Sequence, residues 1–143
     1  MSEKLSSEEI RKLETDCNCT VLAVSKTRDN ETILKVYRNG IRDFGENKAQ
    51  ELSPKYEALP KDIRWHFIGH LQRNKVKYIA PFVYLIHSVD SARLLREINK
   101  QAAKNNRQIN CLLQMHIAKE ESKFGLDEEE LNSILKEDIS ELE

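Results

Sequence analysis

The sequence has few cysteines, and they do not form a recognisable framework. There are three, at positions 17, 19 and 111. An odd and sparse set argues against a disulfide-stabilised fold and fits a reducing compartment such as the cytoplasm. Cys17 and Cys19 are separated by one residue, which is too close for the usual C-x-x-C metal or redox motif. We therefore expect free thiols and a cytoplasmic location.

An excess of charge of either sign is also missing. The 23 Lys and Arg residues nearly balance the 24 Asp and Glu residues, which gives a formal net charge of −1. This balance offers no electrostatic basis for binding nucleic acid or an anionic membrane. No apolar run approaches the length that crosses a bilayer, and the polar, acidic first residues lack the pattern of a secretory signal. We therefore expect neither nucleic acid nor a membrane as a partner.

Several motifs that indicate a particular activity are absent. There is no G-x-x-x-x-G-K-[ST] loop and no G-x-G-x-x-G, so nucleotide binding has no motif support. There is no G-x-S-x-G elbow, and Ser88, His87 and Asp90 lie too close in sequence to converge as a catalytic triad. Asp90 is more simply explained as a helix N-cap. The four histidines lack a metal-ligand spacing, so we expect no metal site.

The sequence does contain a regular alternation of apolar runs and amphipathic segments. Strands are predicted at residues 21–24, 41–44, 63–68, 83–87 and 109–117. Helices are predicted at 6–14, 29–39, 71–79 and 90–105, and also from residue 46 and from residue 127. Pro54 is expected to kink or restart the helix that begins at residue 46.

This alternation predicts a single α/β domain with parallel strands and right-handed crossovers. The 143 residues are enough for one domain with a core. Two architectures fit the pattern. One is an open, doubly wound sheet, and the other is the first five units of a (β/α)₈ barrel, which in full needs roughly 200 residues or more.

A lysine follows the first predicted strand. The segment T-V-L-A-V-S-K-T at residues 20–27 has an apolar run that predicts a strand buried on both faces, and Lys26 comes just after it. On this stretch alone, a solvated loop lysine is the commoner explanation. In both architectures, however, the residues that follow each strand share one rim, where chemistry is usually placed. A rim lysine can form a Schiff base with a carbonyl substrate or with pyridoxal phosphate.

The other rim positions are polar or glycine-bearing. They are Glu46, Asn47, Gly69, His70, Ser88, Asp90 and the segment 116–123.

Four segments at the ends of successive strands carry a resemblance to a known family. They are A-V-S-K-T, F-G-E-N-K-A-Q-E, W-H-F-I-G-H-L-Q-R-N-K and I-H-S-V-D-S. In this order they resemble the pyridoxal phosphate homeostasis proteins, whose fold is similar to the barrel domain of alanine racemase without its second domain. The resemblance covers residues from about 21 to about 135. It implies the N-terminal part, about five βα units, of a (β/α)₈ TIM-type barrel of the alanine racemase N-terminal domain type.

The resemblance also implies a cofactor and its ligands. Lys26 matches the lysine that holds pyridoxal phosphate as an internal aldimine, which is a Schiff base. Asn47 and Ser88 match rim positions that face the cofactor pocket, with a helix cap and a turn residue as their alternative roles. No catalytic residue and no metal ligand is expected. Trp65 and His66 match the family motif but are expected to pack in the core.

The length of the sequence departs from the family pattern. Members usually continue through three more βα units, which carry a phosphate-binding serine and glycine segment and an arginine near the pyridine nitrogen. The sequence therefore predicts a single, incomplete cofactor-binding barrel domain over residues 1–143, with two unpaired sheet edges. Full-length members are expected to be monomers. We expect this chain to bind the cofactor weakly or to self-associate through the open edges.

Three functions follow from these observations. The first is a pyridoxal phosphate-binding protein of cofactor homeostasis, without robust catalysis. The second is a racemase-like enzyme, which needs a base on each face of the substrate. In alanine-racemase-like enzymes the second base comes from another domain or subunit, so its absence from this sequence favours the first function. The third is a fragment of such a barrel that binds no cofactor.

Overall fold

The computed structural model describes residues 6–117 and 125–137, and its centre is a parallel sheet. The five strands pair in the order in which they occur in the chain, and every pairing is parallel. The strands are β1 (Ala23–Val24), β2 (Asp43–Glu46), β3 (Arg64–Phe67), β4 (Leu85–Val89) and β5 (Asn110–Leu113).

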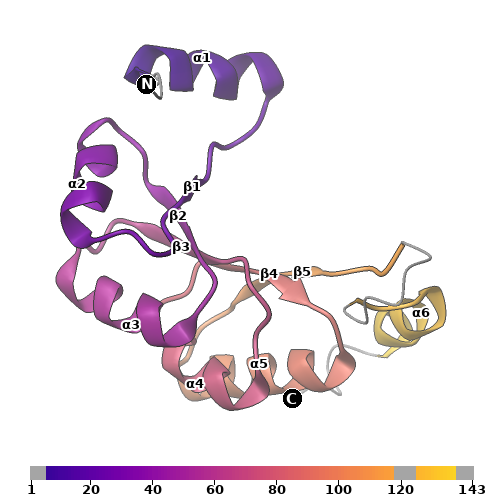
Figure 1. Cartoon of the computed structure of the whole chain (residues 1–143). Helices are drawn as coiled ribbons and strands as arrows, with labels where there is room; N and C mark the ends of the chain where they lie inside the picture. Colours follow the sequence, from indigo (N-terminus) through magenta and orange to yellow (C-terminus); the bar gives the residue numbers. More distant parts are fainter. Residues whose placement is uncertain (1–5, 118–124, 138–143) are drawn as a thin grey trace.

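Helices precede and follow the strands as the sequence pattern predicts. They are α1 (Ser7–Cys17), α2 (Asn30–Arg38), α3 (Ala49–Ala58), a 3₁₀ turn (Arg73–Lys75), α4 (Val76–Ile79), α5 (Ala92–Lys104) and α6 (Glu128–Lys136). Helices α2, α3, α4 and α5 follow one another along one side of the sheet (Figure 1).

Sequential strand order with helices on one side distinguishes between the two architectures. A doubly wound sheet reverses its strand order and carries helices on both faces. A barrel adds each strand next to the previous one and keeps its crossover helices outside. The fold is therefore of the barrel type, with five βα units in sequence. The barrel expectation is confirmed, and the doubly wound alternative is wrong.

The core lies between the sheet and this layer of helices. Strand residues alternate between the two faces of a sheet. Phe44, Trp65 and Phe67 point to the helix side, where they are almost fully buried with Leu52 of α3 and Ile98 of α5. Burying a large apolar side chain contributes about 1.5–3 kcal/mol, so this layer is the main stabilising element of the fold.

The N-caps of α1, α2 and α6 are the residues that the sequence indicates, whereas α5 is capped by Ser91 and not by Asp90. Ser6, Asp29, Ser91 and Asp127 each accept a hydrogen bond from a backbone N–H in the first turn of α1, α2, α5 and α6. Gly40 follows α2 with a φ of +99°, a conformation that glycine adopts without steric cost. Helix α1 is tied to the sheet by the Val21 N–H, which donates to Glu14 at 2.9 Å.

Several predicted boundaries are wrong. Strand β2 extends to Glu46, so Gly45 lies within it, and β4 begins two residues later than predicted. Strand β5 stops at Leu113, and the predicted helix at 71–79 is a 3₁₀ turn followed by the short α4. Pro54 lies inside α3, which neither ends nor restarts there.

The first strand is also less buried than predicted. Strand β1 pairs only with β2 among the described residues, and Val24 is 52% exposed. Val24 belongs to the face that carries none of α2–α5, because strand residues alternate and Ser25 is buried against the other face. The apolar run at residues 21–24 therefore predicted burial correctly for the face of β1 that is turned toward the helices, and wrongly for the opposite face.

No helix in the described ranges is long and apolar enough to cross a membrane.

Candidate functional site

The candidate site lies at the carboxyl edge of the sheet, where the chain leaves each strand. Lys26 follows β1, Asn47 follows β2 directly, and Ser88 lies near the end of β4. All three expected cofactor residues are therefore at the same edge. The structure gives them different environments, which differ in exposure and in hydrogen bonding.

Lys26 is an exposed residue in a turn. Within residues 6–117 and 125–137, no group forms a hydrogen bond or ion pair with its amine. Its neighbours in the chain behave differently. Ser25 is only 3% exposed, and Thr27 has a φ of +63°. This is the left-handed region, where a β-branched residue is a true outlier and is strained by roughly 1–2 kcal/mol.

A buried ion pair lies under this turn. Glu46, at the end of β2, is 0% exposed, and Lys55 of α3 is 6% exposed. Nζ of Lys55 is 2.5 Å from Oε1 of Glu46, and the Ser25 hydroxyl donates to the same oxygen at 2.7 Å. Oε2 of Glu46 is buried without a donor among the described residues. A buried carboxylate needs a compensating charge, and Lys55 supplies it.

The same ammonium reaches two further acceptors. Nζ of Lys55 donates to the carbonyl oxygen of Ser25 at 2.9 Å and to Oε1 of Glu51 at 2.8 Å. Glu51 in turn accepts the Thr27 N–H at 2.6 Å. The hydrogen bond from Lys55, together with the Thr27 N–H, lowers the pKa of the Glu51 carboxyl despite some desolvation. The turn that carries Lys26 is thus held on both sides.

The loops after β2 and β3 and the end of β4 are packed together at Gly69. A Cβ atom on Gly69 would lie 2.6 Å from both Cβ and the carbonyl oxygen of Asn47, so only glycine allows this approach. The buried Ser88 hydroxyl donates to the Gly69 carbonyl oxygen. Asn47 and Ser88 are therefore linked through Gly69, although neither side chain contacts the Lys26 amine within the described residues.

Asn47 also borders a groove beside the start of α3. This cavity of about 440 Å³ is lined by Asn47, Lys48, Ala49, Gln50, Phe67, His70, Leu71, Gln72 and Lys75. It lies on the outer side of the rim, next to the first turn of the helix. His70 contacts Asp90, whose nearest oxygen is 3.3 Å from Nδ1. The rim segment 118–123 lies outside the described residues.

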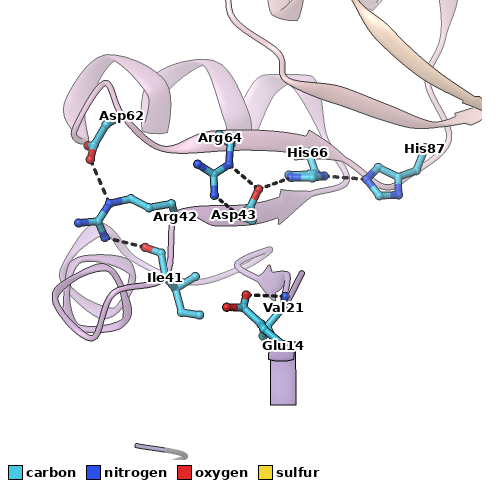
Figure 2. Close-up of polar contacts among 9 residues, drawn as sticks. All are labelled: Glu14, Val21, Ile41, Arg42, Asp43, Asp62, Arg64, His66 and His87. Atoms are coloured by element: carbon cyan, nitrogen blue, oxygen red, sulfur yellow. Dashed lines mark hydrogen bonds and ion pairs between the residues drawn. The ribbon is translucent and has the colours of Figure 1, made fainter. Parts of the chain in front are cut away.

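A second polar cluster occupies the sheet face that carries none of α2–α5. Asp43, Arg64, His66 and His87 are joined in a row (Figure 2). Arg64 donates two hydrogen bonds to Asp43, and Nε2 of His66 is 2.8 Å from Oδ1 of Asp43. Nδ1 of His66 is 2.8 Å from Nε2 of His87. The row borders a cavity of about 470 Å³ that Leu22 and Tyr84 also line.

The protonation states of the row follow from its partners. Burial opposes ionisation of Asp43, but the hydrogen bonds from Arg64 and His66 outweigh it and lower the pKa of the carboxyl. Burial, together with the nearby His66, lowers the pKa of His87. His66 therefore donates through Nε2 to the Asp43 carboxylate. The direction of the hydrogen bond between Nδ1 of His66 and Nε2 of His87 depends on the tautomers of the two rings.

The described residues contain no group of three or more His, Cys, Asp or Glu side chains placed to hold a metal ion. Cys17, Cys19 and Cys111 are free.

Comparison with known proteins identifies the family. The profile of the alanine racemase N-terminal domain matches residues 7–142. The chain belongs to this family.

Individual relatives share a common name. The chain is 45% identical over 119 residues to the pyridoxal phosphate homeostasis protein of Aquifex aeolicus, which covers 82% of this chain and 52% of the relative. It is 36% identical over 124 residues to the protein of the same name in Homo sapiens, which covers 80% of this chain and 45% of the relative. The chain thus spans about half the length of the curated relatives it matches.

Solved structures agree with this relationship. PipY of Synechococcus elongatus without pyridoxal phosphate (PLP) has a TM-score of 0.84 and 31% identity, over 97% of this chain and 66% of PipY. The structure of PipY with PLP bound has a TM-score of 0.81 and 31% identity, over 96% of this chain and 65% of PipY. The fold therefore agrees with the resemblance seen in the sequence.

Sequence reasoning missed the group beneath the Lys26 turn. Glu51 and Lys55 are four residues apart on a helix, a common spacing for a surface ion pair. Nothing in the sequence showed that Lys55 is buried or that it reaches the Ser25 carbonyl. His66 was expected to pack in the core, and it is buried, but its polar contacts with Asp43 and His87 were not foreseen.

Proposed function

We propose that this chain is a single PLP-binding domain that holds the cofactor covalently through Lys26 and serves cofactor homeostasis rather than turnover. The observation that carries the proposal is the state of Lys26. It is an exposed lysine at the carboxyl end of the first strand, its amine has no partner among the described residues, and the backbone on both sides of it is fixed. The names of the relatives and the PLP-bound PipY structure support the choice of ligand.

The donor set at this edge fits a covalent anchor. When bound, PLP supplies an aldehyde that condenses with a lysine amine with loss of one water, and an aromatic ring that withdraws electrons. Lys26 provides an accessible amine for that bond. The hydroxyl of the neighbouring Ser25 donates to Glu46 and to the Gly45 carbonyl oxygen. It therefore stabilises the turn and is not assigned to a ligand.

Asn47 and Ser88 are proposed as the further cofactor-site residues. Asn47 is half-buried, with an amide that can donate and accept hydrogen bonds. The Ser88 hydroxyl gives its proton to the Gly69 carbonyl and keeps its lone pairs for a ligand donor. Ser88 therefore both sets the position of the loop after β3 and remains able to accept one hydrogen bond.

The carrier role is preferred to the two alternatives. A racemase needs two bases around its substrate, and we assign only one amine at this edge. A chain that binds no cofactor would give no functional reason for the strained, hydrogen-bonded turn around Lys26. We further propose a cytoplasmic location, which the three free thiols support, and no nucleic-acid or membrane partner, which the net charge of −1 supports.

The test is a titration of the chain with PLP, followed by its visible absorbance. We expect saturable binding that Lys26→Ala abolishes. The matched control is Lys35→Ala, which removes an exposed lysine of α2 and should leave binding unchanged. Equal binding by Lys26→Ala and the control would contradict the proposal. Racemisation of alanine by the chain, lost in Lys26→Ala, would instead establish the enzyme alternative.

A further inference from the structure

Lys55 is a buried cation that the proposed function leaves unused. It lies in α3, its side chain is 7% exposed, and its three hydrogen-bond acceptors are Glu46, Glu51 and Ser25. Lysine is rarely buried, because its ammonium loses hydration, unless charged and polar partners compensate. Two carboxylates and one carbonyl fill all three donor positions of this ammonium.

The arrangement controls the two peptide groups that flank Lys26. The Ser25 carbonyl belongs to the peptide group before Lys26, and Lys55 binds it directly. The Thr27 N–H belongs to the peptide group after Lys26, and Glu51 binds it through the oxygen that also accepts from Lys55. The Lys55 ammonium therefore contacts the first peptide group directly and the second through Glu51, and it adds to the turn's own hydrogen bond from the Arg28 N–H to the Ser25 carbonyl.

The backbone at Thr27 shows that the turn needs such a restraint. A threonine at a φ of +63° is strained, and strained residues persist only where surrounding contacts determine their conformation. The contact that fixes the Thr27 amide is the one from Glu51. Strain of this kind is concentrated at functional sites, and here it lies next to the proposed anchor.

We propose that Lys55 is a positioning residue, which holds the turn so that the Lys26 amine stands where an aldehyde ligand meets it. This inference rests on the proposed function. A fixed backbone reduces the conformational entropy that Lys26 loses when it forms a bond. Lys55 itself is no competing nucleophile, because its nitrogen is enclosed by three acceptors. Glu46 acts as the counter-ion of Lys55. Glu51 accepts a hydrogen bond from Lys55 and another from the Thr27 N–H, and so connects the ammonium to Thr27.

Three variants test this role. Lys55→Met/Glu46→Gln removes both fully buried charges and leaves only the partly exposed Glu51 without its cation, so we expect it to fold even where Lys55→Met alone, which leaves Glu46 buried and unpaired, does not. Lys55→Arg keeps the positive charge and should rescue part of the effect. Lys100→Met replaces an exposed lysine of α5 and serves as the control.

Two readouts are taken on folded protein, as judged by circular dichroism. The first is hydrogen exchange of the Thr27 amide without cofactor. We expect the exchange rate of the Thr27 amide to rise about tenfold or more in the double variant, as for the loss of one hydrogen bond to a charged group. The rate should stay unchanged in Lys100→Met.

The second readout is borohydride trapping of limiting PLP, with the modified lysine identified by peptide mapping. We expect the label on Lys26 to fall about tenfold in the double variant, to fall less in Lys55→Arg and to stay unchanged in Lys100→Met.

The outcomes separate this inference from the proposed function. Unchanged exchange at Thr27 in the double variant would overturn the restraint. Faster exchange with undiminished labelling of Lys26 would overturn the positioning role. If wild-type Lys26 takes no label, the proposed function fails and the positioning role with it, while the exchange result still shows whether Lys55 restrains the turn.

Discussion

Nζ of Lys55 lies 2.9 Å from the carbonyl oxygen of Ser25, the residue that precedes Lys26. This contact joins α3 to the turn after β1, and the two residues are 30 positions apart in the sequence. It places a buried charge beside the proposed cofactor anchor. The stability of the fold and the position of Lys26 therefore depend on the same group.

Removing this charge alone should destabilise the protein strongly. Lys55→Met leaves the fully buried Glu46 without a counter-ion, and breaking such a pair costs about 3–5 kcal/mol. Lys55→Met/Glu46→Gln removes both charges and should recover most of this loss. The free energy of unfolding in urea measures both values. A single variant within about 1 kcal/mol of the wild type would show that Glu46 is not held by Lys55.

A methyl group at Gly69 should separate the loops after β2 and β3. Gly69→Ala places a Cβ atom 2.6 Å from the Asn47 backbone oxygen, and overpacking of this kind costs about 1–3 kcal/mol. Gly45→Ala is the comparison, because its Cβ would first meet the end of the Ile68 side chain, at 3.0 Å. Thermal unfolding should show the larger loss for Gly69→Ala. An equal or smaller loss would mean that the two loops separate without cost.

The fold should lose stability just below pH 6.5 because of His87. Its pKa in the folded protein is lowered from the ordinary 6.5 by burial and by the nearby His66. Between that lowered pKa and 6.5 only the unfolded chain binds the proton, so stability falls as the pH falls, by up to about 1.4 kcal/mol per pH unit. Below the lowered pKa the loss is complete and constant.

Unfolding measured across this range should therefore show a smaller slope for His87→Gln than for the wild type. Asp43 affects stability in a different pH range. Its pKa in the folded protein is lowered from the ordinary 3.8, so its contribution to stability is fully present above about pH 3.8 and is lost as the pH falls through the lowered pKa. A slope near pH 6 that survives His87→Gln would assign the effect elsewhere.

Much of the fold follows from local sequence, and the reasons are physical. The apolar runs and the capping residues Ser6, Asp29 and Asp127 encode the elements locally, so their order and type could be predicted. The boundaries of β2 and β4 could not, because pairing with neighbouring strands decides where a strand ends. The partial exposure of β1 has the same origin, since an apolar run does not show how many neighbours a strand has.

The candidate site was predictable to a smaller extent. Lys26, Asn47 and Ser88 were placed at one edge by the βα pattern and the strand-end motifs, and the structure places them there. Their roles as cofactor ligands stay predictions. The partners of the Lys26 turn come from α3, and contacts between distant segments leave no trace in a local pattern. The burial of Lys55 is visible only once α3 has packed on the sheet.

Cys111 should react far more slowly with an alkylating agent than Cys17. Burial raises the pKa of the Cys111 thiol to about 11, so only about 0.1% is thiolate at pH 8. Cys17 is exposed. Alkylation followed by peptide mass spectrometry should show Cys111 at least tenfold slower in the folded chain and equal to Cys17 in denaturant. Equal rates in the folded chain would contradict the packing of β5.

The most direct test of the account is to trap PLP on the wild-type chain with borohydride and to map the modified lysine by mass spectrometry. The account predicts a single modified residue, Lys26, at cofactor concentrations that leave the exposed Lys12 and Lys100 unmodified. Label spread evenly over exposed lysines, or no label at all, would contradict it.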